Sequence, residues 1–288
     1  MVDSRVHVSV VIPCYNAAGV LGGQLVALQR QIASFKWEII VADNGSTDAT
    51  AFTAAQYSTQ SLPVVVCDAS AHRGVNHARN VGVRNSRGDF ILLCDADDQV
   101  TDGWLAAMSE AFTSGASLVG GRLMRVTPDR RPVGVADDGL RKDLSYLPWP
   151  QGANCGFSRP VYDELGGFDE GYTRGGDETD FFWRAQLRGY TLEYVRAAAI
   201  LYTEKPVSKQ RFWQYYYYGR SHVQLFKAFA AAGMPRGSIW SVLRAWLEIL
   251  RILVAGVRSG DRRRIAIQHL GQRVGRIGGS AAFRVWYL

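Results

Sequence analysis

Apolar runs and helical repeats alternate along the first hundred residues of the chain. Four short runs rich in Val, Ile and Leu predict buried strands, at residues 6–13, 37–43, 63–68 and 89–94. Between them, apolar residues return at helical spacing, which predicts helices near 20–32, 48–58 and 74–86. Such alternation is typical of the α/β class, in which helices cover both faces of a mostly parallel sheet.

The pattern changes further along the chain. Prolines and glycines make residues 124–157 irregular, and we expect this segment to cover the edge of the sheet. A helix after Gly176 and a strand at 190–195 then resume the alternation. From residue 206 the pattern predicts long amphipathic helices, which charged residues interrupt too often for a membrane span. We therefore expect a sheet region at 1–204 and a helical region at 205–288.

Charge divides at the same point. The chain carries a net charge of +7, yet residues 205–288 alone hold 15 Lys and Arg against Glu248 and Asp261, a net charge of +13. The first 204 residues therefore carry −6. This asymmetry indicates an anionic partner for the helical region. Nucleic acid is disfavoured, because the region has no nucleic-acid-binding motif and its aromatic residues lie within apolar helical patterns.

Several classes of site are excluded by missing motifs. Cys14, Cys67, Cys94 and Cys155 lie far apart, which predicts reduced core thiols rather than a metal or redox site. No GxGxxG follows the first strand and no GxxxxGK[ST] occurs, so any phosphate chemistry would depend on a metal. The N-terminal residues do not resemble a secretory signal, and we expect a cytoplasmic protein.

Polar clusters follow all four predicted strands, at 14–16, 43–48, 68–74 and 95–98. In a parallel sheet these loops meet at one edge, which is where ligands bind. Asp43 ends the second strand and could accept a hydrogen bond from a base or a ribose. The turn NGST that follows explains the other polar residues of its cluster without a ligand.

The fourth cluster, in ILLCDADDQ at 91–99, is acidic. Asp95 and Asp97 are two residues apart and can face one ligand, such as a divalent cation that holds a diphosphate. The structural alternative is an acidic turn that caps a helix near Thr101, above all for Asp98.

A second acidic group, DETD at 177–180, opens a predicted helix. Carboxylates in a first helical turn complement the helix dipole, so capping alone would explain them. The functional alternative is a general base, which must be ionised at neutral pH, as a carboxylate at a helix N-terminus is expected to be. The residues by themselves leave both interpretations open.

Five ordered segments between residues 6 and 200 resemble successive motifs of the family 2 glycosyltransferases with the GT-A fold. They are VSVVIPCYNAAGVL, EIIVADNGSTDAT, GVNHARNVGVRNSRGDFILLCDADD, GANCGFSRPVYDELGGFDE and GGDETDFFWRAQLRGY. The resemblance implies a Rossmann-like GT-A sheet flanked by helices, with a nucleotide-binding half (1–98) and an acceptor-binding half (99–204). The helices of 205–288 resemble tails of bacterial members, though more weakly.

The same resemblance implies roles for individual residues. Nucleotide contacts are implied for Pro13, Tyr15, Asn16, Asp43, Arg73, Gly74, Asp95 and Ala96. Asp95 and Asp97 would hold Mg²⁺ or Mn²⁺ against the donor diphosphate. Asn154 and Trp149 would flank the donor sugar and the acceptor.

Two positions depart from the family pattern. The family usually has Glu-Asp where this chain has Asp177-Glu178, so the resemblance favours Glu178 as the catalytic base, with Asp177 placing the acceptor. The family often has a metal-binding histidine after the strand near 195, where this chain reads ILYTEK. Tyr202 is a poor magnesium ligand, so we expect a more weakly held metal.

Together these features predict an inverting glycosyltransferase of bacterial type, of use in cell-wall polysaccharide synthesis. Its donor would be a UDP-, dTDP- or GDP-sugar, and its acceptor a hydroxyl of a glycan, glycolipid or natural product. The alternative is a nucleotide-sugar-binding protein without turnover. Residues 236–288 would either contact the inner face of the cell membrane, near a lipid-linked acceptor, or pack on the sheet region or on a second subunit of a homodimer.

Overall fold

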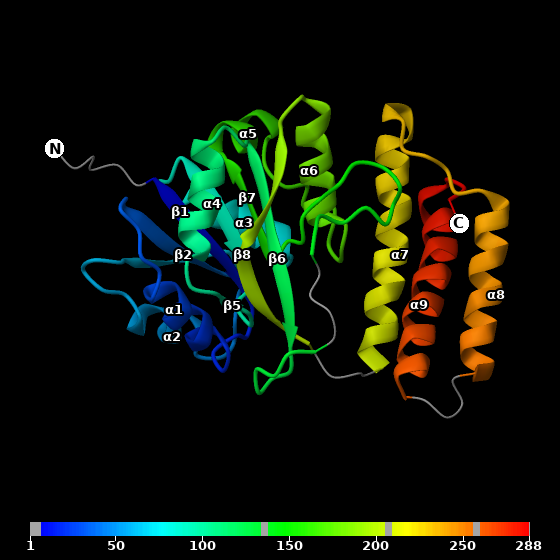
Figure 1. Cartoon of the computed structure of the whole chain (residues 1–288), viewed down its shortest axis with the longest axis horizontal. Helices are drawn as coiled ribbons and strands as arrows, with labels where there is room; N and C mark the ends of the chain where they lie inside the picture. Colours follow the sequence, from blue (N-terminus) through cyan, green and yellow to red (C-terminus); the bar gives the residue numbers. More distant parts are fainter. Residues whose placement is uncertain (1–6, 134–137, 205–208, 256–259, 288) are drawn as a thin grey trace. The chain divides into compact units, whose positions relative to one another are not determined.

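The computed structural model of the chain describes residues 7–133, 138–204, 209–255 and 260–287 (Figure 1). The chain divides into two compact units. The sheet unit comprises residues 1–141, 148–173 and 177–205, and the helical unit comprises 142–147, 174–176 and 206–288. The first is built on a mixed sheet, and the second on long helices that pack against one another.

In the described residues the strands form one eight-stranded sheet in the order β3-β2-β1-β4-β7-β6-β8-β5. Their bounds are β1 Val8–Cys14, β2 Trp37–Asp43, β3 Val64–Asp68, β4 Phe90–Cys94, β5 Gln99–Val100, β6 Leu118–Val126, β7 Asn154–Ser158 and β8 Leu192–Thr203. Strands β1 to β4 are parallel, whereas β7 runs antiparallel to both β4 and β6. The four strands predicted in the first hundred residues are confirmed, as is the α/β class.

Three strands lie where the sequence predicts none: the two-residue β5, and the longer β6 and β7. The end of β6 and the start of β7 fall within residues 124–157, so the expectation that this whole segment is irregular is wrong at both ends. Glycines interrupt the pattern of β-branched residues by which β6 and β7 would be recognised. The close packing of these strands nevertheless requires the glycines. A Cβ atom on Gly121 would lie 2.3 Å from the carbonyl oxygen of Ala198, and one on Gly156 would lie 2.8 Å from that of Ile91.

Helices cover both faces of the sheet (Figure 1). Their bounds are α1 Leu21–Gln29, α2 Thr50–Gln56, α3 Val75–Arg84, α4 Trp104–Thr113, α5 Arg159–Leu165 and α6 Asp177–Leu187. Successive strand residues point to opposite faces, so Val10 packs in one core cluster with Leu25 of α1 and Trp104 of α4. Val11 points the other way, toward α3, where a Cβ atom on Gly82 would lie 2.4 Å from its methyl carbon.

The parallel strands bring their carboxyl ends to one edge of the sheet. Cys14 of β1 is the register partner of Asp43 of β2, and Asp43 in turn is the partner of Asp68 of β3. Strand β4, which precedes the acidic cluster, pairs with β1 on its other side. The polar loops that follow these strands therefore share one edge, as the sequence predicts.

Three long helices dominate the described part of the helical unit: α7 Lys209–Phe229, α8 Ile239–Ala255 and α9 Gly260–Phe283, with a short 3-10 turn, η1, at Ala230–Ala232 (Figure 1). Helix α9 packs against both α7 and α8. In the described part of the chain, every helix falls short of the length or apolarity that crossing a membrane requires.

Glycines set the separation of α7 and α9. Gly271, Gly275 and Gly279 recur every fourth residue and so share one face of α9. A Cβ atom on Gly275 would lie 2.0 Å from the carbonyl oxygen of Tyr216, and one on Gly219 of α7 would lie 2.0 Å from that of Gln272. The two backbones are therefore in direct contact along a glycine seam, as we call these four residues.

We expect Gly275→Ala to destabilise the helical unit, because the added methyl group meets a backbone carbonyl that cannot move aside. Overpacking of this kind costs about 1–3 kcal/mol. The matched control is Gly278→Ala, whose Cβ atom would lie 2.6 Å from the hydroxyl of Tyr216, the end of a side chain that can rotate. Unfolding followed by circular dichroism should show a lower midpoint for Gly275→Ala than for the control, and equal midpoints would contradict the seam.

Candidate active site

The acidic cluster lies in the loop that follows β4. Asp95, Asp97 and Asp98 each place a carboxylate oxygen within 4.8 Å of the others. The backbone amide of Thr203 donates to Asp98 Oδ1 (3.0 Å), and the Thr203 hydroxyl donates to the carbonyl of Asp97 (2.9 Å). Gln24 of α1 donates to the carbonyl of Asp95 (3.3 Å). The loop is thus fixed by β8 and α1, and Asp98 binds β8 instead of capping α4.

The cluster fits a hard divalent cation, because such ions prefer several carboxylate oxygens in one place. Tyr202 occupies the position where the family often has a histidine, and the negative charges of the three carboxylates act on its phenol. Burial, followed by the charges of Asp98, Asp95 and Asp97, raises the pKa of the Tyr202 phenol far above its ordinary value. The phenol therefore stays protonated and does not add an anionic ligand to the three carboxylates.

Asp177, the first residue of α6, is buried and forms an ion pair with Arg79 of α3. Arg79 is itself only 4% exposed. Burial by itself would lower the pKa of Arg79, but the carboxylates of Asp177, Glu178 and Asp95 raise it above its ordinary value. One buried guanidinium therefore interacts with both acidic groups, the one after β4 and the one that opens α6.

Arg79 is the principal site residue that the sequence does not predict. It lies in the segment GVNHARNVG, where Asn76, Arg79 and Asn80 occupy positions i, i+3 and i+4 and so share a helix face. All three are buried. The sequence feature that could have identified Arg79 is this polar helix face, because the helix begins directly after a loop at the binding edge of the sheet.

Glu178 is half-buried beside Asp177. Burial, followed by the charge of Asp177, raises the pKa of Glu178 to about 8, although Arg79 acts in the opposite direction. The expectation that a helix N-terminus keeps this carboxylate ionised at neutral pH therefore does not hold for Glu178 in this structure, because burial outweighs the helix dipole. A base with a pKa near the working pH is still well matched to proton transfer.

Gly152, of the segment GAN, packs against the same residues. A Cβ atom at this position would lie 2.5 Å from Nη2 of Arg79 and 3.6 Å from the carboxyl carbon of Glu178. The backbone of this segment is therefore in contact with the site, and only a glycine leaves room for Arg79.

Asn154 has no exposed surface. Its amide donates to the carbonyls of Arg122 and Ala198 (3.0 Å each), and its oxygen accepts a bond from Trp104 Nε1 (2.8 Å). These bonds tie β7 to β6, β8 and α4. These bonds give Asn154 a structural role, and the sugar contact that the resemblance implies stays a prediction.

Trp149 is also largely buried, at 4% exposed. Its ring packs edge-on against Trp183 of α6, with centroids 5.6 Å apart, and the guanidinium of Arg141 lies 6.0 Å from its centroid. The ring therefore packs against α6, and the sugar contact that the resemblance implies for Trp149 stays a prediction.

Four of the residues assigned to the nucleotide line one cavity of about 400 Å³: Pro13, Tyr15, Arg73 and Gly74. The remaining lining residues are Cys14, Asn44, Val75 and Ala78. The guanidinium of Arg73 lies 4.4 Å from the centroid of the Tyr15 ring, and this ring is 54% exposed. The cavity thus combines an open aromatic face with a cation, which suits a nucleotide.

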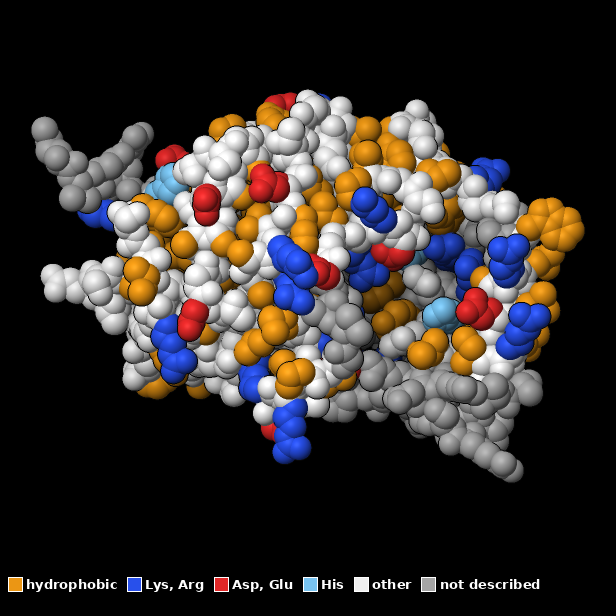
Figure 2. Space-filling view, viewed as in Figure 1, with side chains coloured by type: hydrophobic (Ala, Val, Ile, Leu, Met, Phe, Trp, Pro, Cys, Tyr) orange, Lys and Arg blue, Asp and Glu red, His pale blue; other side chains and the backbone are white. Residues whose placement is uncertain are grey.

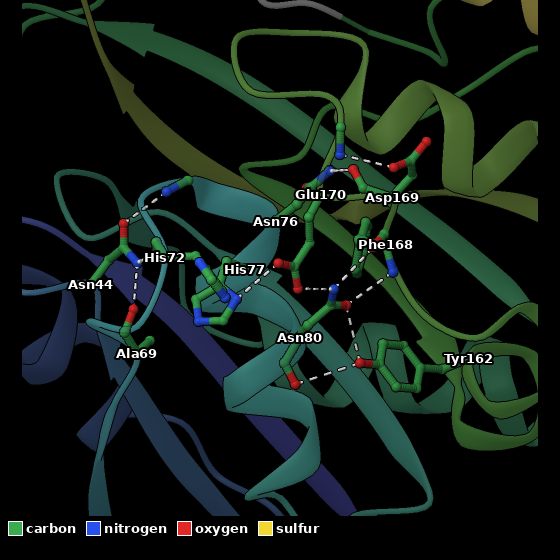
Figure 3. A network of polar contacts seen from close by, with 12 residues as sticks. Asn44, Ala69, His72, Asn76, His77, Asn80, Tyr162, Phe168, Asp169 and Glu170 are labelled. Carbon is green, nitrogen blue, oxygen red and sulfur yellow. Dashed lines mark hydrogen bonds and ion pairs between the residues drawn. The ribbon is translucent and has the colours of Figure 1, made fainter.

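Asn44 fixes the loop that carries Arg73 and Gly74. Its amide donates to the carbonyls of Ala69 (2.6 Å) and His72 (2.7 Å), as Figure 3 shows. Its oxygen accepts a bond from the backbone amide of Gly74 (3.0 Å). In the sequence, the motif NGST indicates Asn44 only as part of a turn.

The other residues assigned to the nucleotide lie in the neighbouring loops. Asp43 accepts a bond from the amide of Ser46 (3.0 Å), and Asn16, with a left-handed φ of 50°, accepts one from the amide of Thr47 (2.8 Å). Both therefore shape the turn at 43–48. Ala96 is buried between the two metal candidates Asp95 and Asp97.

Helix α3 joins this cavity to the segment before α6. Asn76 donates to the carbonyl of Asp169 (2.7 Å), and Asn80 donates to that of Phe168 (2.9 Å) (Figure 3). One carboxylate oxygen of Glu170 accepts a hydrogen bond from the amide of Asn80, and the other lies 2.9 Å from Nδ1 of His77. Helix α3 lines the cavity with Val75 and Ala78. The same helix also holds residues 168–170, which precede the carboxylates of α6 in the sequence.

The parallel strands, the acidic cluster after β4 and the carboxylates of α6 agree with the glycosyltransferase of GT-A fold that the resemblance implies. The sequence model of the family named Glycosyl transferase family 2 matches residues 9–166, and the chain belongs to this family.

Known relatives agree with this assignment. The chain is 29% identical over 203 residues to glycosyltransferase AglE of Haloferax volcanii, covering 67% of this chain and 66% of AglE. It is 30% identical over 208 residues to the glycosyltransferase YwdF of Bacillus subtilis, covering 68% of this chain and 73% of YwdF. The match to YfnE of Bacillus subtilis spans only 28% of that longer protein.

Solved structures share the fold. The mannosyltransferase PcManGT from Pyrobaculum calidifontis, in complex with GDP-Man and Mn²⁺, superposes with a TM-score of 0.66 at 18% identity, covering 96% of this chain and 88% of that one. S. aureus TarS 1–349 in complex with UDP-GlcNAc gives a TM-score of 0.60 at 16% identity, covering 98% of this chain and 93% of TarS 1–349. At these identities the likeness concerns the fold.

We expect the carboxyl group of Glu178 to titrate near pH 8. NMR of isotope-labelled glutamate side chains identifies its resonance as the one that Glu178→Gln removes. Asp177→Asn should lower this pKa, because the neighbouring negative charge that raises it is gone. Asp180→Asn is the matched control, since Asp180 is paired with Arg184, and it should leave the titration in place. Titration of Glu178 near its ordinary value in the unmodified chain would contradict the site geometry.

Proposed function

We propose that the chain is an inverting glycosyltransferase that moves a sugar from a nucleotide diphosphate donor to an acceptor hydroxyl. The observation that carries this proposal is the buried Arg79, which pairs with Asp177 and whose charge interacts with both Glu178 and Asp95. Groups suited to a departing diphosphate and a group suited to accepting a proton are thereby gathered around one residue. The catalytic domain would be 1–204, with halves at 1–98 and 99–204, and the division of the chain near residue 205 supports this boundary.

The donor nucleotide would bind in the cavity lined by Tyr15, Arg73 and Gly74, with Asp43 and Asn16 in the adjoining turn. The exposed ring of Tyr15 offers a stacking face, and Arg73 supplies positive charge. UDP-, dTDP- and GDP-sugars all fit this chemistry. Structural neighbours were solved with GDP-Man and with UDP-GlcNAc, which supports a nucleotide sugar without choosing the base.

Asp95 and Asp97 would hold Mg²⁺ or Mn²⁺, and Asp98 would fix their loop to β8. A divalent cation there supplies Lewis acidity toward the diphosphate leaving group. Mn²⁺ is present in the structures of PcManGT and of GalNAc-T7, both of which share the fold.

Glu178 would accept the proton of the acceptor hydroxyl as its oxygen attacks the anomeric carbon from the face opposite the leaving group. General base catalysis of this kind contributes about 10²–10⁴-fold. Asp177 would hold Arg79 in place through their ion pair, and Arg79 would limit the rise in the pKa of Glu178. The two neighbouring carboxylates thus receive different tasks.

The acceptor would be a glycan, a glycolipid or a natural product, and a lipid-linked glycan is favoured. One relative, 29% identical over 91 residues, is named UDP-Glc:alpha-D-GlcNAc-diphosphoundecaprenol beta-1,3-glucosyltransferase WfgD of Escherichia coli. A lipid-linked acceptor would place the protein in the cytoplasm beside a membrane, with contact through residues 236–288. Packing on the sheet unit or in a homodimer is the alternative use of that region.

Thermal denaturation with a panel of UDP-, dTDP- and GDP-sugars, each with Mn²⁺, Mg²⁺ or a chelator, tests donor binding. We expect one nucleotide class to raise the melting temperature in the presence of metal, because a ligand at 100 times its Kd adds about 2.7 kcal/mol of stability. Asp97→Asn should remove the metal-dependent part. The exposed Asp102, outside the cluster, provides the control Asp102→Asn. A panel in which no nucleotide stabilises the chain would overturn the proposal.

Glu178→Gln separates catalysis from binding. We expect this variant to keep the thermal shift with donor and metal, yet to release nucleoside diphosphate from the donor about 10²–10⁴-fold more slowly. Glu110→Gln, at an exposed position of α4, is the matched control and should retain full turnover. Turnover that survives in Glu178→Gln would exclude this residue as the base. Binding without turnover even in the unmodified chain, with lipid-linked and soluble acceptors alike, would favour a nucleotide-sugar-binding protein.

A further inference from the structure

Helix α8 exposes a row of large apolar side chains. Trp240 is 75% exposed, and Leu243, Leu247 and Leu250 are between 50% and 56% exposed. Their spacing of three or four residues places them on one face of the helix. On the opposite face Ile249 is 1% exposed, and α8 packs against α9. The helix is therefore held by one face and presents the other, the α8 outer face, to solvent in the described structure.

A contiguous apolar row of this kind differs from single exposed apolar residues, which are common on protein surfaces. Phe52 of α2 and Ile32 after α1 are two such residues in the sheet unit, at 68% and 87% exposed. On α8, four large apolar side chains follow one another over three turns of the helix. This row points to a partner that covers it.

Basic residues border the row. Arg244 lies one turn from Trp240, Arg251 lies one turn from Leu247, and both arginines are exposed. Glu248 is the one acidic residue in the sequence of α8, and residues 205–288 as a whole carry +13. Figure 2 shows hydrophobic and basic side chains, with an acidic one between the basic ones, on the part of the surface that α8 occupies in Figure 1. A partner that fits this face has an apolar layer bounded by negative charge.

These properties favour an anionic lipid surface over a second copy of the chain. A symmetric contact between two outer faces would gather the arginines of both copies at one apolar interface, where Glu248 is the one carboxylate that each α8 provides. In a bilayer surface, by contrast, Trp and Leu side chains enter the boundary between headgroups and acyl chains, and arginines reach the lipid phosphates. A helix that lies on the surface needs neither the length nor the apolarity of a membrane span, which agrees with the described helices.

We propose that the α8 outer face, formed by Trp240, Leu243, Leu247 and Leu250 with Arg244 and Arg251, docks on the surface of a bilayer that contains anionic phospholipid. The proposal deepens the proposed function, on which its link to a lipid-linked acceptor rests. Docking itself involves no turnover, so it is measured independently of the transferase reaction.

The experiment is flotation of the full chain with vesicles of phosphatidylcholine alone or of phosphatidylcholine with phosphatidylglycerol. We expect binding to the anionic vesicles at low salt, weaker binding at high salt and little binding to the neutral vesicles. No flotation with anionic vesicles at low salt would overturn the proposal. The same samples are assayed for donor hydrolysis without vesicles, so that loss of docking and loss of the transferase function are read separately.

Two variants locate the docking face. Trp240→Ser with Leu247→Ser should reduce vesicle binding at least tenfold, and Arg244→Gln with Arg251→Gln should reduce it about 30-fold, at about 1 kcal/mol for each arginine. Phe52→Ser and Arg30→Gln, both at exposed positions of the sheet unit, are the matched controls and should bind as the unmodified chain does. Circular dichroism checks that each variant keeps its helices.

Sedimentation of the same proteins supplies the decisive contrast. A chain that floats with vesicles, and whose oligomeric state the serine variants leave unchanged, supports docking on lipid. A dimer that the serine variants convert to a monomer would assign the α8 outer face to a second copy and overturn the proposal. Binding that survives in both double variants would overturn it as well, because another surface would then carry the docking.

Discussion

The burial of Arg79 is the constraint on which the arrangement of the sheet unit depends. An unpaired charge in a protein interior costs several kcal/mol, a large share of the about 5–15 kcal/mol by which a domain is stable, so this guanidinium requires carboxylates around it. Asp177 provides the ion pair, while Glu178 and Asp95 add negative charge nearby. Helix α3, the start of α6 and the loop after β4 have to converge for this to hold, and Gly152 leaves the necessary room.

The same constraint divides the work between two adjacent carboxylates. Asp177 is taken up by the ion pair, whereas burial and its neighbour's charge leave Glu178 with a raised pKa of about 8. Neighbouring groups whose environments differ in this way can act as a fixed charge and as a proton acceptor. The family usually has Glu-Asp where this chain has Asp177-Glu178. In this chain the inverted order corresponds to the position of Arg79, which pairs with the first of the two residues.

Local patterns account for what the sequence could predict. Strands β1 to β4 repeat apolar residues over short stretches, and a parallel sheet then brings the loops that carry Tyr15 and Arg73 to one edge. Contacts between distant segments account for what it could not. Arg79 meets a carboxylate 98 residues away, and Asn154 joins strands whose glycines conceal them from periodicity. A residue type at one position does not reveal a partner so far along the chain.

The glycine seam between α7 and α9 bears on how the helical unit can change during evolution. Where two helices meet backbone to backbone, their separation does not depend on the size of interlocking side chains. Substitutions on α8 and on the outward sides of the other helices then leave the frame of the unit intact. One frame can in this way carry different surfaces, so that descendants of this chain could exchange one docking partner for another without rebuilding the helices that present it.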